Sequence, residues 1–272
     1  MNITGTTRIA AVLGFPVEHS RSPAMLNAAF TADKIDAVMV PIGVAPEGLT
    51  AVVAGLRAAN ALGASVTIPH KLAVSKLCDE LSAEARAIGA VNCLQLGEQI
   101  VGHNTDCDGF LDALVAAGCE LRGKRVILLG AGGAARAVAY AVRGARAIEV
   151  IARRPVDVGW AQAWPWTEEN LRDCFGRADV VVDCTSACMN PESDLAFTES
   201  LPLDALPAGA MFATLVYHRA TSLLERVSAL GYSTLDGRSM LVHQGARAFT
   251  IWTGMPAPIA VMTRALDASL AR

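Results

Sequence analysis

Residues 126–136 read Val-Ile-Leu-Leu-Gly-Ala-Gly-Gly-Ala-Ala-Arg, an apolar run that passes directly into a glycine-rich turn. The apolar residues predict a buried strand, and glycines 130 and 132 with Ala135 predict a tight turn that opens a helix. Gly130 permits the turn, Gly132 lets the backbone approach a pyrophosphate, and the small Ala135 lets the helix pack closely on the strand. The first N–H groups of a helix are unpaired and can bind phosphate. The segment therefore predicts a dinucleotide site, with an ordinary strand–helix turn as the alternative.

Short apolar runs alternate with helical patterns along all 272 residues, which is typical of the α/β fold class. We expect strands at residues 8–13, 37–44, 64–68, 125–130, 147–151, 179–184 and 211–216, and a hairpin at 93–102. We expect helices at residues 23–33, 46–60, 108–117, 133–143, 167–174 and 220–230, and two more after Asp236 that separate near Gly254. The strands of the second half are continuously apolar, which indicates a parallel sheet covered on both faces. A polar stretch near 104–124 indicates a joint between two domains, with a ligand cleft between them.

The composition excludes several classes of protein. With 23 Lys and Arg against 26 Asp and Glu, the formal net charge is −3, so there is no basic footprint for nucleic acid or an anionic membrane. The longest apolar stretch, residues 126–152, is interrupted by four charged side chains and does not predict a membrane span. The first residues lack the pattern of a secretory signal, so we expect a cytoplasmic protein.

The seven cysteines form an odd set without a Cys-x-x-Cys pair. Cys184 and Cys188 are four residues apart, but no His or further Cys pair lies beside them in the sequence. We therefore expect reduced thiols that pack as small apolar side chains, with neither disulfides nor a bound metal.

About twenty residues after the glycine turn, a dinucleotide site selects its cofactor through the residues that end the next strand. An acidic residue there would bind the free ribose hydroxyls of NAD, but this chain has Arg153 and Arg154. Two guanidinium groups can hold the 2′-phosphate of NADP by charge-assisted hydrogen bonds, so we expect NADP rather than NAD. Two alternatives stay open: both arginines are solvated surface residues, or the nearby Asp157 favours NAD.

Three polar clusters in the first half follow predicted strands: residues 19–23, residues 65–71, and Asn92 with residues 104–106. Open α/β sheets bind ligands at the carboxyl ends of their strands. The clusters are therefore candidates for binding the hydroxyl groups and the carboxylate of a small polar molecule. Each cluster alone has a simpler explanation, as a helix cap, a turn or a surface charge.

Lys71 stands out because the chain contains only four lysines against nineteen arginines. A lysine paired with an aspartate, here Asp106, can exchange a proton with a carbinol oxygen while hydride moves to a nicotinamide.

Together these motifs resemble those of the shikimate dehydrogenase family. The matching segments follow one another across the whole chain, at residues 14–23, 66–71, 89–92, 102–106 with Gly109, 129–136, 236–245 and 252–254. The resemblance implies an α/β substrate domain, residues 1–105 completed by the C-terminal helices at 237–272, and a Rossmann-type NADP-binding domain at 106–236. It implies an NADP-dependent oxidoreductase that interconverts 3-dehydroshikimate and shikimate in aromatic amino-acid biosynthesis.

The resemblance also assigns roles to single residues. Lys71 and Asp106 would be the catalytic pair. The residues implied to bind substrate are Ser20 and Ser22 at the carboxylate, Thr67, Asn92 and Gln244 at the ring hydroxyls, and Tyr217 near the carboxylate. The residues implied to bind the cofactor are Gly130, Ala131, Gly132, Gly133, Ala134, Ala135, Arg153 and Arg154, with Thr185 and Ser186 on the nicotinamide side.

Several positions depart from the family pattern while the catalytic pair is intact. Ser65 stands where Asn is usual and Cys93 where Thr is commoner, and residues 152–154 replace Asn-Arg-Thr. Residues 183–188 (Asp-Cys-Thr-Ser-Ala-Cys) replace Asn-Ala-Thr-x-x-Gly, Arg238-Ser239 replaces Leu-Gly, and Thr214, Arg219 and Ser222 replace an Asp and two prolines. These changes favour, as alternatives, a paralogue that acts with NAD or NADP on quinate or another ring hydroxy acid, or a non-enzymatic sensor of cofactor or shikimate. We expect a small-molecule ligand, and either a monomer or a homodimer.

Overall fold

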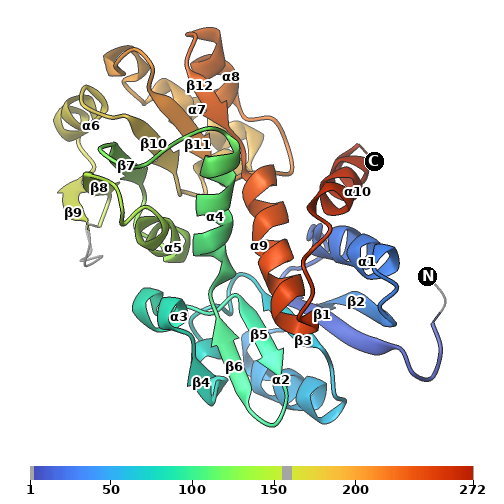
Figure 1. Ribbon diagram of the computed structural model, residues 1–272. Helices are drawn as coiled ribbons and strands as arrows, with labels where there is room; N and C mark the ends of the chain where they lie inside the picture. Colours follow the sequence, from blue (N-terminus) through green and yellow to red (C-terminus); the bar gives the residue numbers. More distant parts are fainter. Residues whose placement is uncertain (1–2, 155–160, 272) are drawn as a thin grey trace. The chain divides into compact units, whose positions relative to one another are not determined.

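The computed structural model describes residues 3–154 and 161–271, and Figure 1 labels their helices and strands. The chain divides into two compact units, Met1–Gly109 with Leu241–Arg272 and Phe110–Met240. The two-domain α/β class is confirmed. The two unit boundaries fall inside the helices α4 (Thr105–Ala116) and α9 (Gly237–Thr253), each of which contributes residues to both units.

The first unit contains a six-stranded sheet in the order β2-β1-β3-β5-β6-β4. Its strands are β1 (Arg8–Gly14), β2 (Ala37–Gly43), β3 (Gly63–Val66), β4 (Glu80–Leu81), β5 (Cys93–Leu96) and β6 (Ile100–His103). Strands β1, β2 and β3 are parallel, whereas β5 is antiparallel to both β3 and β6 and forms the predicted hairpin with β6. Because β5 reverses direction, its first residue lies at the same edge of the sheet as the last residues of β1, β3 and β6.

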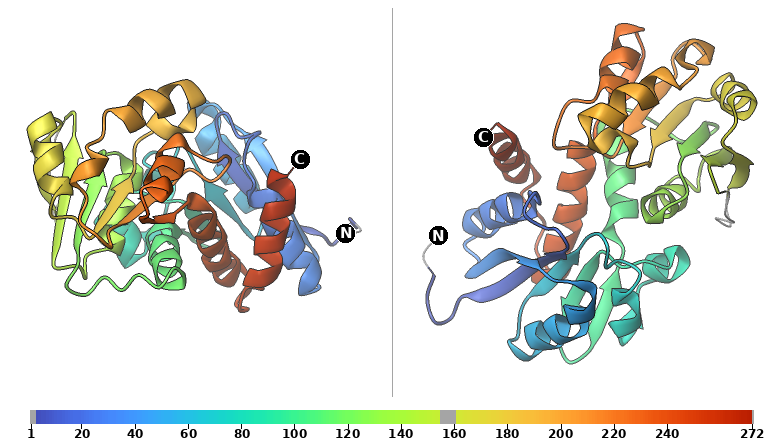
Figure 2. Two further views of the ribbon diagram at one scale, coloured as in Figure 1. Left: turned by 90° about the horizontal axis from the view of Figure 1, so that it is seen from above. Right: turned by 180° about the vertical axis from the view of Figure 1, so that it is seen from behind.

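Helices cover both faces of this sheet. They are α1 (Ser22–Ala32), α2 (Leu49–Ala58), α3 (Ala83–Ile88), the later turns of α9, and α10 (Ile259–Leu270), with 3₁₀ turns at Pro46–Gly48 and Val74–Leu77. Successive residues of β1 alternate between two apolar layers: Ala10 and Val12 pack with α1, α9 and α10, and Ala11 and Leu13 pack on the α2 side. In the first layer α1 and α10 lie side by side (Figure 2).

The second unit contains a wholly parallel six-stranded sheet in the order β12-β11-β10-β7-β8-β9. Its strands are β7 (Arg125–Leu129), β8 (Ala147–Ala152), β9 (Gln162–Pro165), β10 (Val180–Asp183), β11 (Met211–Thr214) and β12 (Ser233–Leu235). The chain runs outward from β7 to β9 and then from β10 to β12 in the opposite direction. The carboxyl ends of β7 and β10 therefore form the switch point at which sheets of this topology bind dinucleotides.

The helices of this unit are α5 (Gly133–Ala141), α6 (Glu168–Phe175), α7 (Pro191–Glu199) and α8 (Ser222–Ala229), with 3₁₀ turns at Ala187–Met189 and Leu203–Ala205. Threonine hydroxyls cap two of them: Thr167 accepts from the N–H of Asn170, and Thr221 from that of Leu224, both at 3.2 Å. None of the described helices combines the length and the apolar character needed to cross a lipid bilayer.

A buried carboxylate holds the outer strands of this sheet together. Glu149 on β8 is 2% exposed and accepts hydrogen bonds from Arg125, from Arg177 at 2.8 Å and from Trp164 Nε1 at 2.7 Å. Burial alone would raise the pKa of Glu149, but these hydrogen bonds lower it to about 2. Because the folded pKa lies below the unfolded one, the carboxylate stabilises the fold at neutral pH, and this contribution is lost as the pH falls from about 4.5 towards 2.

Most of the expected elements are confirmed to within a few residues. The expected helix 46–60 begins instead as a 3₁₀ turn and becomes α-helical only at Leu49. The expected strand 64–68 ends at Val66, because the N–H of Thr67 bonds to Leu13 O and the chain then turns, with the N–H of His70 bonded to Thr67 O. The sequence did not predict β4, β9, β12, α3 and α7, because these elements are short and polar residues interrupt them, so none forms the continuous apolar run or the sustained periodicity by which strands and helices are recognised.

The contact between α9 and the first sheet depends on a glycine. A Cβ atom on Gly63 would lie within 3.0 Å of both Leu94 O and the Trp252 indole, which are joined by a 3.0 Å hydrogen bond from Trp252 Nε1. We expect Gly63→Ala to lower the free energy of unfolding by about 3 kcal/mol, because neither the backbone nor the buried ring can move away freely. Urea denaturation measures this change.

Gly55→Ala is the matched control, since nothing lies within 4 Å of a Cβ at this position on α2. This variant should be more stable than the wild type by about 0.5–1 kcal/mol, because alanine favours the helix. Equal stability of Gly63→Ala and the wild type would contradict the packing described for α9.

Candidate active site

An ion pair between Lys71 and Asp106 is the centre of the polar site in the first unit. Lys71 Nζ lies 2.6 Å from Asp106 Oδ2, and the two side chains are 27% and 12% exposed. Lys71 lies in the turn after β3, and Asp106 lies in the first turn of α4, directly after β6. The fold thus brings together two groups that are 35 positions apart in the sequence and leaves both accessible to a small molecule.

The side chain of Asn92 holds this pair in place. Its amide nitrogen donates to Asp106 Oδ1 at 2.8 Å and to Thr105 Oγ1 at 3.0 Å. Its amide oxygen accepts from the backbone N–H of Thr105 at 2.6 Å. Asn92 is 3% exposed, so these hydrogen bonds form in a largely dry environment that strengthens them. Asp106 Oδ1 is therefore held by the amide, and Oδ2 is directed to Lys71.

The position of Asn92 corrects one expectation from the sequence. Asn92 does not follow a strand but directly precedes β5. It reaches the ligand-binding edge because β5 is antiparallel, with Cys93 opposite both Ser65 on β3 and His103 on β6. Asn104, which does follow a strand, donates to Ala90 O at 3.0 Å and so anchors the neighbouring loop.

Ser20, Ser22 and Thr67 follow the adjacent strands β1 and β3. Ser22 is buried at the start of α1, and its backbone N–H lies 3.4 Å from Ser20 Oγ. Thr67 is half-buried, and a Cβ atom on Gly14 would meet its methyl group, so the end of β1 and Thr67 are in close contact. The three hydroxyl groups therefore belong to the same edge of the sheet as Lys71.

Gln244 lies beside the face of α4 that carries Asp106. A Cβ atom on Gly109 would lie within 3.0 Å of the Gln244 backbone, so α4 and α9 touch there, one turn after Asp106. Gln244 Nε2 donates to Leu241 O on its own helix at 2.8 Å. Tyr217 belongs to the other unit, after β11, where its ring lies edge-on to His218 with the centroids 5.8 Å apart.

The glycine turn of the second unit follows β7 at the switch point of its sheet. Gly130 has a φ of +95°, a conformation that favours glycine, and its N–H bonds to Ile151 O on β8 at 2.8 Å. Nothing lies within 4 Å of a Cβ built on Gly132 or Gly133, so the start of α5 is open. Ala131 is half-buried and Ala134 exposed, whereas Ala135 is fully buried against the sheet. The open turn and the first N–H groups of α5 suit a phosphate.

Arg153 and Arg154 are exposed directly after β8, whose last residues lie beside those of β7. Neither guanidinium forms an ion pair with another described residue, so both can bind an anion. Asp157, the residue that keeps NAD open as an alternative, lies outside the described residues.

Thr185 and Ser186 follow β10 on the other side of the switch point. Thr185 is half-buried and Ser186 exposed. Their position depends on Asp183, the last residue of β10, whose carboxyl oxygen Oδ1 accepts from the Thr185 N–H at 2.9 Å and from the Thr185 hydroxyl at 2.7 Å. The sequence alone did not predict a role for Asp183, although a single acidic residue at the end of an apolar strand was a signal for one.

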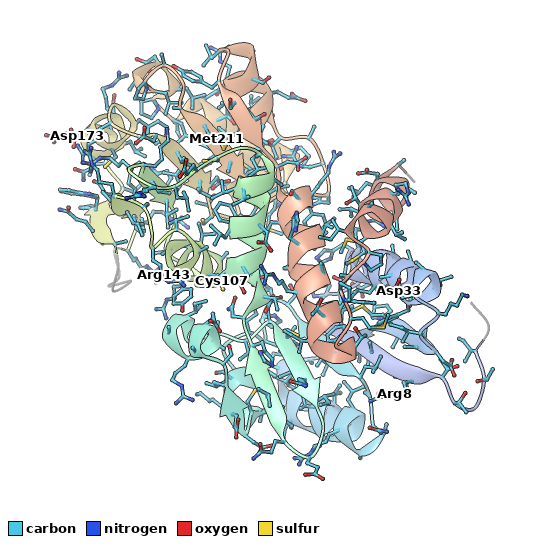
Figure 3. The ribbon with its side chains drawn as sticks, in the orientation of Figure 1. Arg8, Asp33, Cys107, Arg143, Asp173 and Met211 are labelled. Carbon is cyan, nitrogen blue, oxygen red and sulfur yellow. The ribbon has the colours of Figure 1, made fainter. Side chains whose placement is uncertain are left out.

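Neither metal ligation nor a disulfide appears in the described part of the chain. No three His, Cys, Asp or Glu side chains gather there as a metal site needs, and the seven cysteines are free thiols. Burial raises the pKa of the Cys107 and Cys174 thiols to about 12, which keeps them neutral and unreactive. Cys107, labelled in Figure 3, follows Asp106 in the sequence of α4.

Comparisons with known proteins identify relatives along the whole chain. Residues 12–94 match the family model described as the shikimate dehydrogenase substrate binding domain, and residues 237–266 match the shikimate 5'-dehydrogenase C-terminal domain. The shikimate dehydrogenase (NADP(+)) of Geobacter sp. (strain M21) is 41% identical and is aligned over 100% of this chain and 98% of its own length.

Solved structures give the same result. The shikimate 5-dehydrogenase from Thermus thermophilus, in complex with NADP(H) and shikimate, is 33% identical with a TM-score of 0.86, covering 96% of this chain and 99% of its own. A 5-ketofructose reductase of Gluconobacter sp. strain CHM43 is 29% identical with a TM-score of 0.85, covering 98% of this chain and 100% of its own.

The hydrogen bonds of Asn92 predict the behaviour of a charged variant. Asn92→Asp would place a second carboxylate against Asp106 Oδ1, and two carboxylates so close cannot both ionise without cost. The shared site then has a raised folded pKa, so the variant should lose stability as the pH rises above about 4, reaching about 2–3 kcal/mol at neutral pH. Urea denaturation at a series of pH values measures this loss.

Gln99→Glu is the control, because it adds the same charge at an exposed position in the turn between β5 and β6. Its stability should follow that of the wild type at every pH. A parallel pH profile for Asn92→Asp would show that Asn92 and Asp106 do not interact as described.

Proposed function

The chain belongs to the shikimate dehydrogenase family, and on that premise we propose that it interconverts 3-dehydroshikimate and shikimate with NADP as cofactor. The observation that carries the proposal is the Lys71–Asp106 pair, held at 2.6 Å on the ligand-binding edge of the first sheet. The relatives named for this activity, aligned over 98% of their own length, support it.

The second unit has the features that NADP requires. The open glycine turn and the first N–H groups of α5 would hold the pyrophosphate, and Arg153 and Arg154 would hold the 2′-phosphate. Thr185 and Ser186 would line the nicotinamide side. When bound, NADP supplies the hydride that is exchanged with the carbinol carbon of the substrate.

Lys71 would perform the proton transfer. In the direction of reduction its ammonium group gives a proton to the ketone oxygen as that oxygen becomes a hydroxyl, and in oxidation its amine takes the proton back. Asp106 would orient the ammonium group and accept a hydrogen bond from a ring hydroxyl. This arrangement needs both side chains to be partly exposed, as they are.

The remaining polar residues would bind and orient the substrate. We assign Ser20 and Ser22 to its carboxylate, with Tyr217 near it, and Thr67 and Gln244 to ring hydroxyls. Both amide hydrogens of Asn92 are already donated to Thr105 and Asp106, so its main role would be to position Asp106. A cytoplasmic location, and the choice between monomer and homodimer, stay predictions.

A related substrate is the second candidate. The 5-ketofructose reductase has nearly the same fold, so its name associates this architecture with a ketone other than 3-dehydroshikimate. The changed residues at 183–188 and Arg238 would then alter specificity, although the Arg238 guanidinium is neutralised by Asp236 at 3.2 Å.

The direct test is formation of reduced cofactor (NADPH or NADH) by the purified protein with shikimate or quinate, each supplied with NADP⁺ or NAD⁺. We expect kcat/KM for shikimate with NADP⁺ to exceed each other combination at least about tenfold. The double variant Arg153→Ala/Arg154→Ala should raise KM for NADP⁺ by about 10–100-fold, because two charge-assisted bonds are lost, and change KM for NAD⁺ little.

Arg143→Ala is the matched control in the same unit. Arg143, labelled in Figure 3, is exposed and lies over the Tyr140 ring at 4.0 Å, so its loss should leave both cofactors unaffected. Turnover of quinate alone would establish the second candidate, and cofactor binding without turnover of either acid would indicate a sensor.

A further inference from the structure

A cluster of buried polar side chains lies behind the carboxyl ends of β10 and β11 in the second unit. It consists of Asp183, Cys188, Asp194, Thr214 and Arg219, and we refer to it as the β10 cluster. Asp183 and Asp194 are 1% and 0% exposed, and the Cys188 thiol contacts both carboxyl groups. Carboxyl groups this deeply buried are uncommon unless they are paired, so the two acids need separate explanations.

Asp194 is paired. Its Oδ2 accepts from Arg219 Nη2 at 2.5 Å and from the Ser222 N–H at 2.7 Å. Burial alone would raise the pKa of Asp194, but these two donors lower it. Asp194 is therefore a compensated carboxylate at neutral pH.

Asp183 is not compensated in this way. Its Oδ1 accepts two hydrogen bonds from Thr185, but Oδ2 is buried without a hydrogen-bond partner, and no described cation forms an ion pair with it. Burial raises the pKa of Asp183, and the nearby Thr185, Cys188 and Thr214 offset only part of this effect. A proton on the carboxyl group would remove the charge from an oxygen that nothing else neutralises.

No described group that faces Asp183 from a neighbouring element carries an unmatched charge that would lower or raise the pKa of Asp183 further. The register partner on β7 is the apolar Leu129, and the partner on β11 is Thr214. Burial also raises the pKa of the Cys184 and Cys188 thiols, so both stay neutral. The negative charge of Asp194, from α7, is matched by Arg219.

Asp183 also determines the shape of the segment beside the glycine turn. Its Oδ1 folds back the N–H and hydroxyl of Thr185, and the Thr185 hydroxyl in turn accepts from the N–H of Ala187 at 3.1 Å. The Thr185 methyl group would lie 3.1 Å from a Cβ on Gly130, so the segment is in direct contact with the glycine turn. A change at Asp183 is thereby transmitted to both sides of the switch point.

We propose that Asp183 is a positioning residue for dinucleotide binding, and that its carboxyl group, by holding residues 184–187 against the glycine turn, makes this binding weaken as the pH rises. Ionisation puts an uncompensated negative charge next to a turn that would hold a pyrophosphate, and it disturbs the segment that lines this turn. The proposal rests on the proposed NADP site and adds a pH response to it.

The protonation state of Asp183 in the folded and unfolded protein determines the direction in which pH changes stability and binding. The folded pKa of Asp183 lies above its unfolded value, so the folded protein retains this proton to higher pH than the unfolded chain does. The contribution of Asp183 to stability is complete below about pH 4 and is lost as the pH rises towards the folded pKa. Bound dinucleotide favours the neutral form further, so the dissociation constant should rise over the same range.

The test is the dissociation constant for NADP⁺, measured by calorimetry on the whole protein from about pH 4 to about pH 9, for the wild type and Asp183→Asn. Asparagine keeps the acceptor for Thr185 and cannot ionise. The ratio of the wild-type constant to the variant constant cancels the titration of NADP⁺ itself, and it should rise about tenfold across the range. The melting temperature without ligand should likewise fall more steeply with pH in the wild type.

Asp204→Asn is the matched control, because it removes an exposed carboxyl group of the same unit, and its constants should follow the wild type. Thr185→Val is a second variant that keeps the methyl group against Gly130 but loses the hydroxyl. It should weaken NADP⁺ binding several-fold even at the low-pH end of the range, because one hydrogen bond to Asp183 is removed.

A ratio for Asp183→Asn that stays constant with pH would overturn the proposal, and so would unchanged affinity in Thr185→Val. Absence of NADP⁺ binding by the wild type at every pH would instead contradict the proposed function. In that event the melting temperatures still test Asp183, since equal pH profiles for the wild type and Asp183→Asn would exclude an effect of its ionisation.

Discussion

The hydrogen bonds of Asn92 are the constraint on which the site in the first unit depends. One amide group holds the first turn of α4 through Thr105 and fixes one carboxyl oxygen of Asp106, which leaves the other oxygen for Lys71. This arrangement is possible only because β5 is antiparallel, so that its first residue reaches the edge where β3 and β6 end. The mixed sheet and the proposed proton transfer are therefore linked by a single side chain.

In the second unit several departures from the family pattern form one connected change. Asp183 stands where Asn is usual and Thr214 where Asp is usual, and the two are register partners on β10 and β11. Compared with the family pattern, the acidic residue of this pair is therefore on β10 instead of β11. Arg219 and Ser222 stand where prolines are usual. Arg219 donates to Asp194 from its guanidinium, and Ser222 donates from its backbone N–H. Proline has neither group, so it could not make these hydrogen bonds. The altered residues therefore form new hydrogen bonds with one another and are consistent with a second unit that still binds a dinucleotide.

The sequence predicted the parts of the structure that are carried by strong local patterns. The apolar strand and glycine turn at 126–136 are adjacent in sequence and in the fold, so their arrangement followed from their order. The edge strands β9 and β12 could not be found in the same way, because partly exposed strands of three or four residues do not form an apolar run.

Long-range placement was the second limit. The residue types of Lys71 and Asp106 suggested their chemistry, but the distance between them depends on the antiparallel pairing of β5 with β3. The local sequence predicted the hairpin of β5 and β6 and did not show this pairing. The role of Asp183 depends on its surroundings. The sequence places an acidic residue at the end of a strand, but only the structure shows that Oδ2 is buried without a hydrogen-bond partner.

In the proposed reaction Lys71 transfers the proton and contributes little to the binding of either ligand. The most direct measurement is the rate of NADPH formation in a single turnover, with the wild type and Lys71→Met both saturated with NADP⁺ and shikimate. Lys76→Met, at an exposed position, is the control. We expect a rate at least about 100-fold lower in Lys71→Met, because a general acid–base group is lost, with dissociation constants for both ligands within about threefold of the wild type. Equal single-turnover rates in Lys71→Met and the wild type would contradict this role of Lys71.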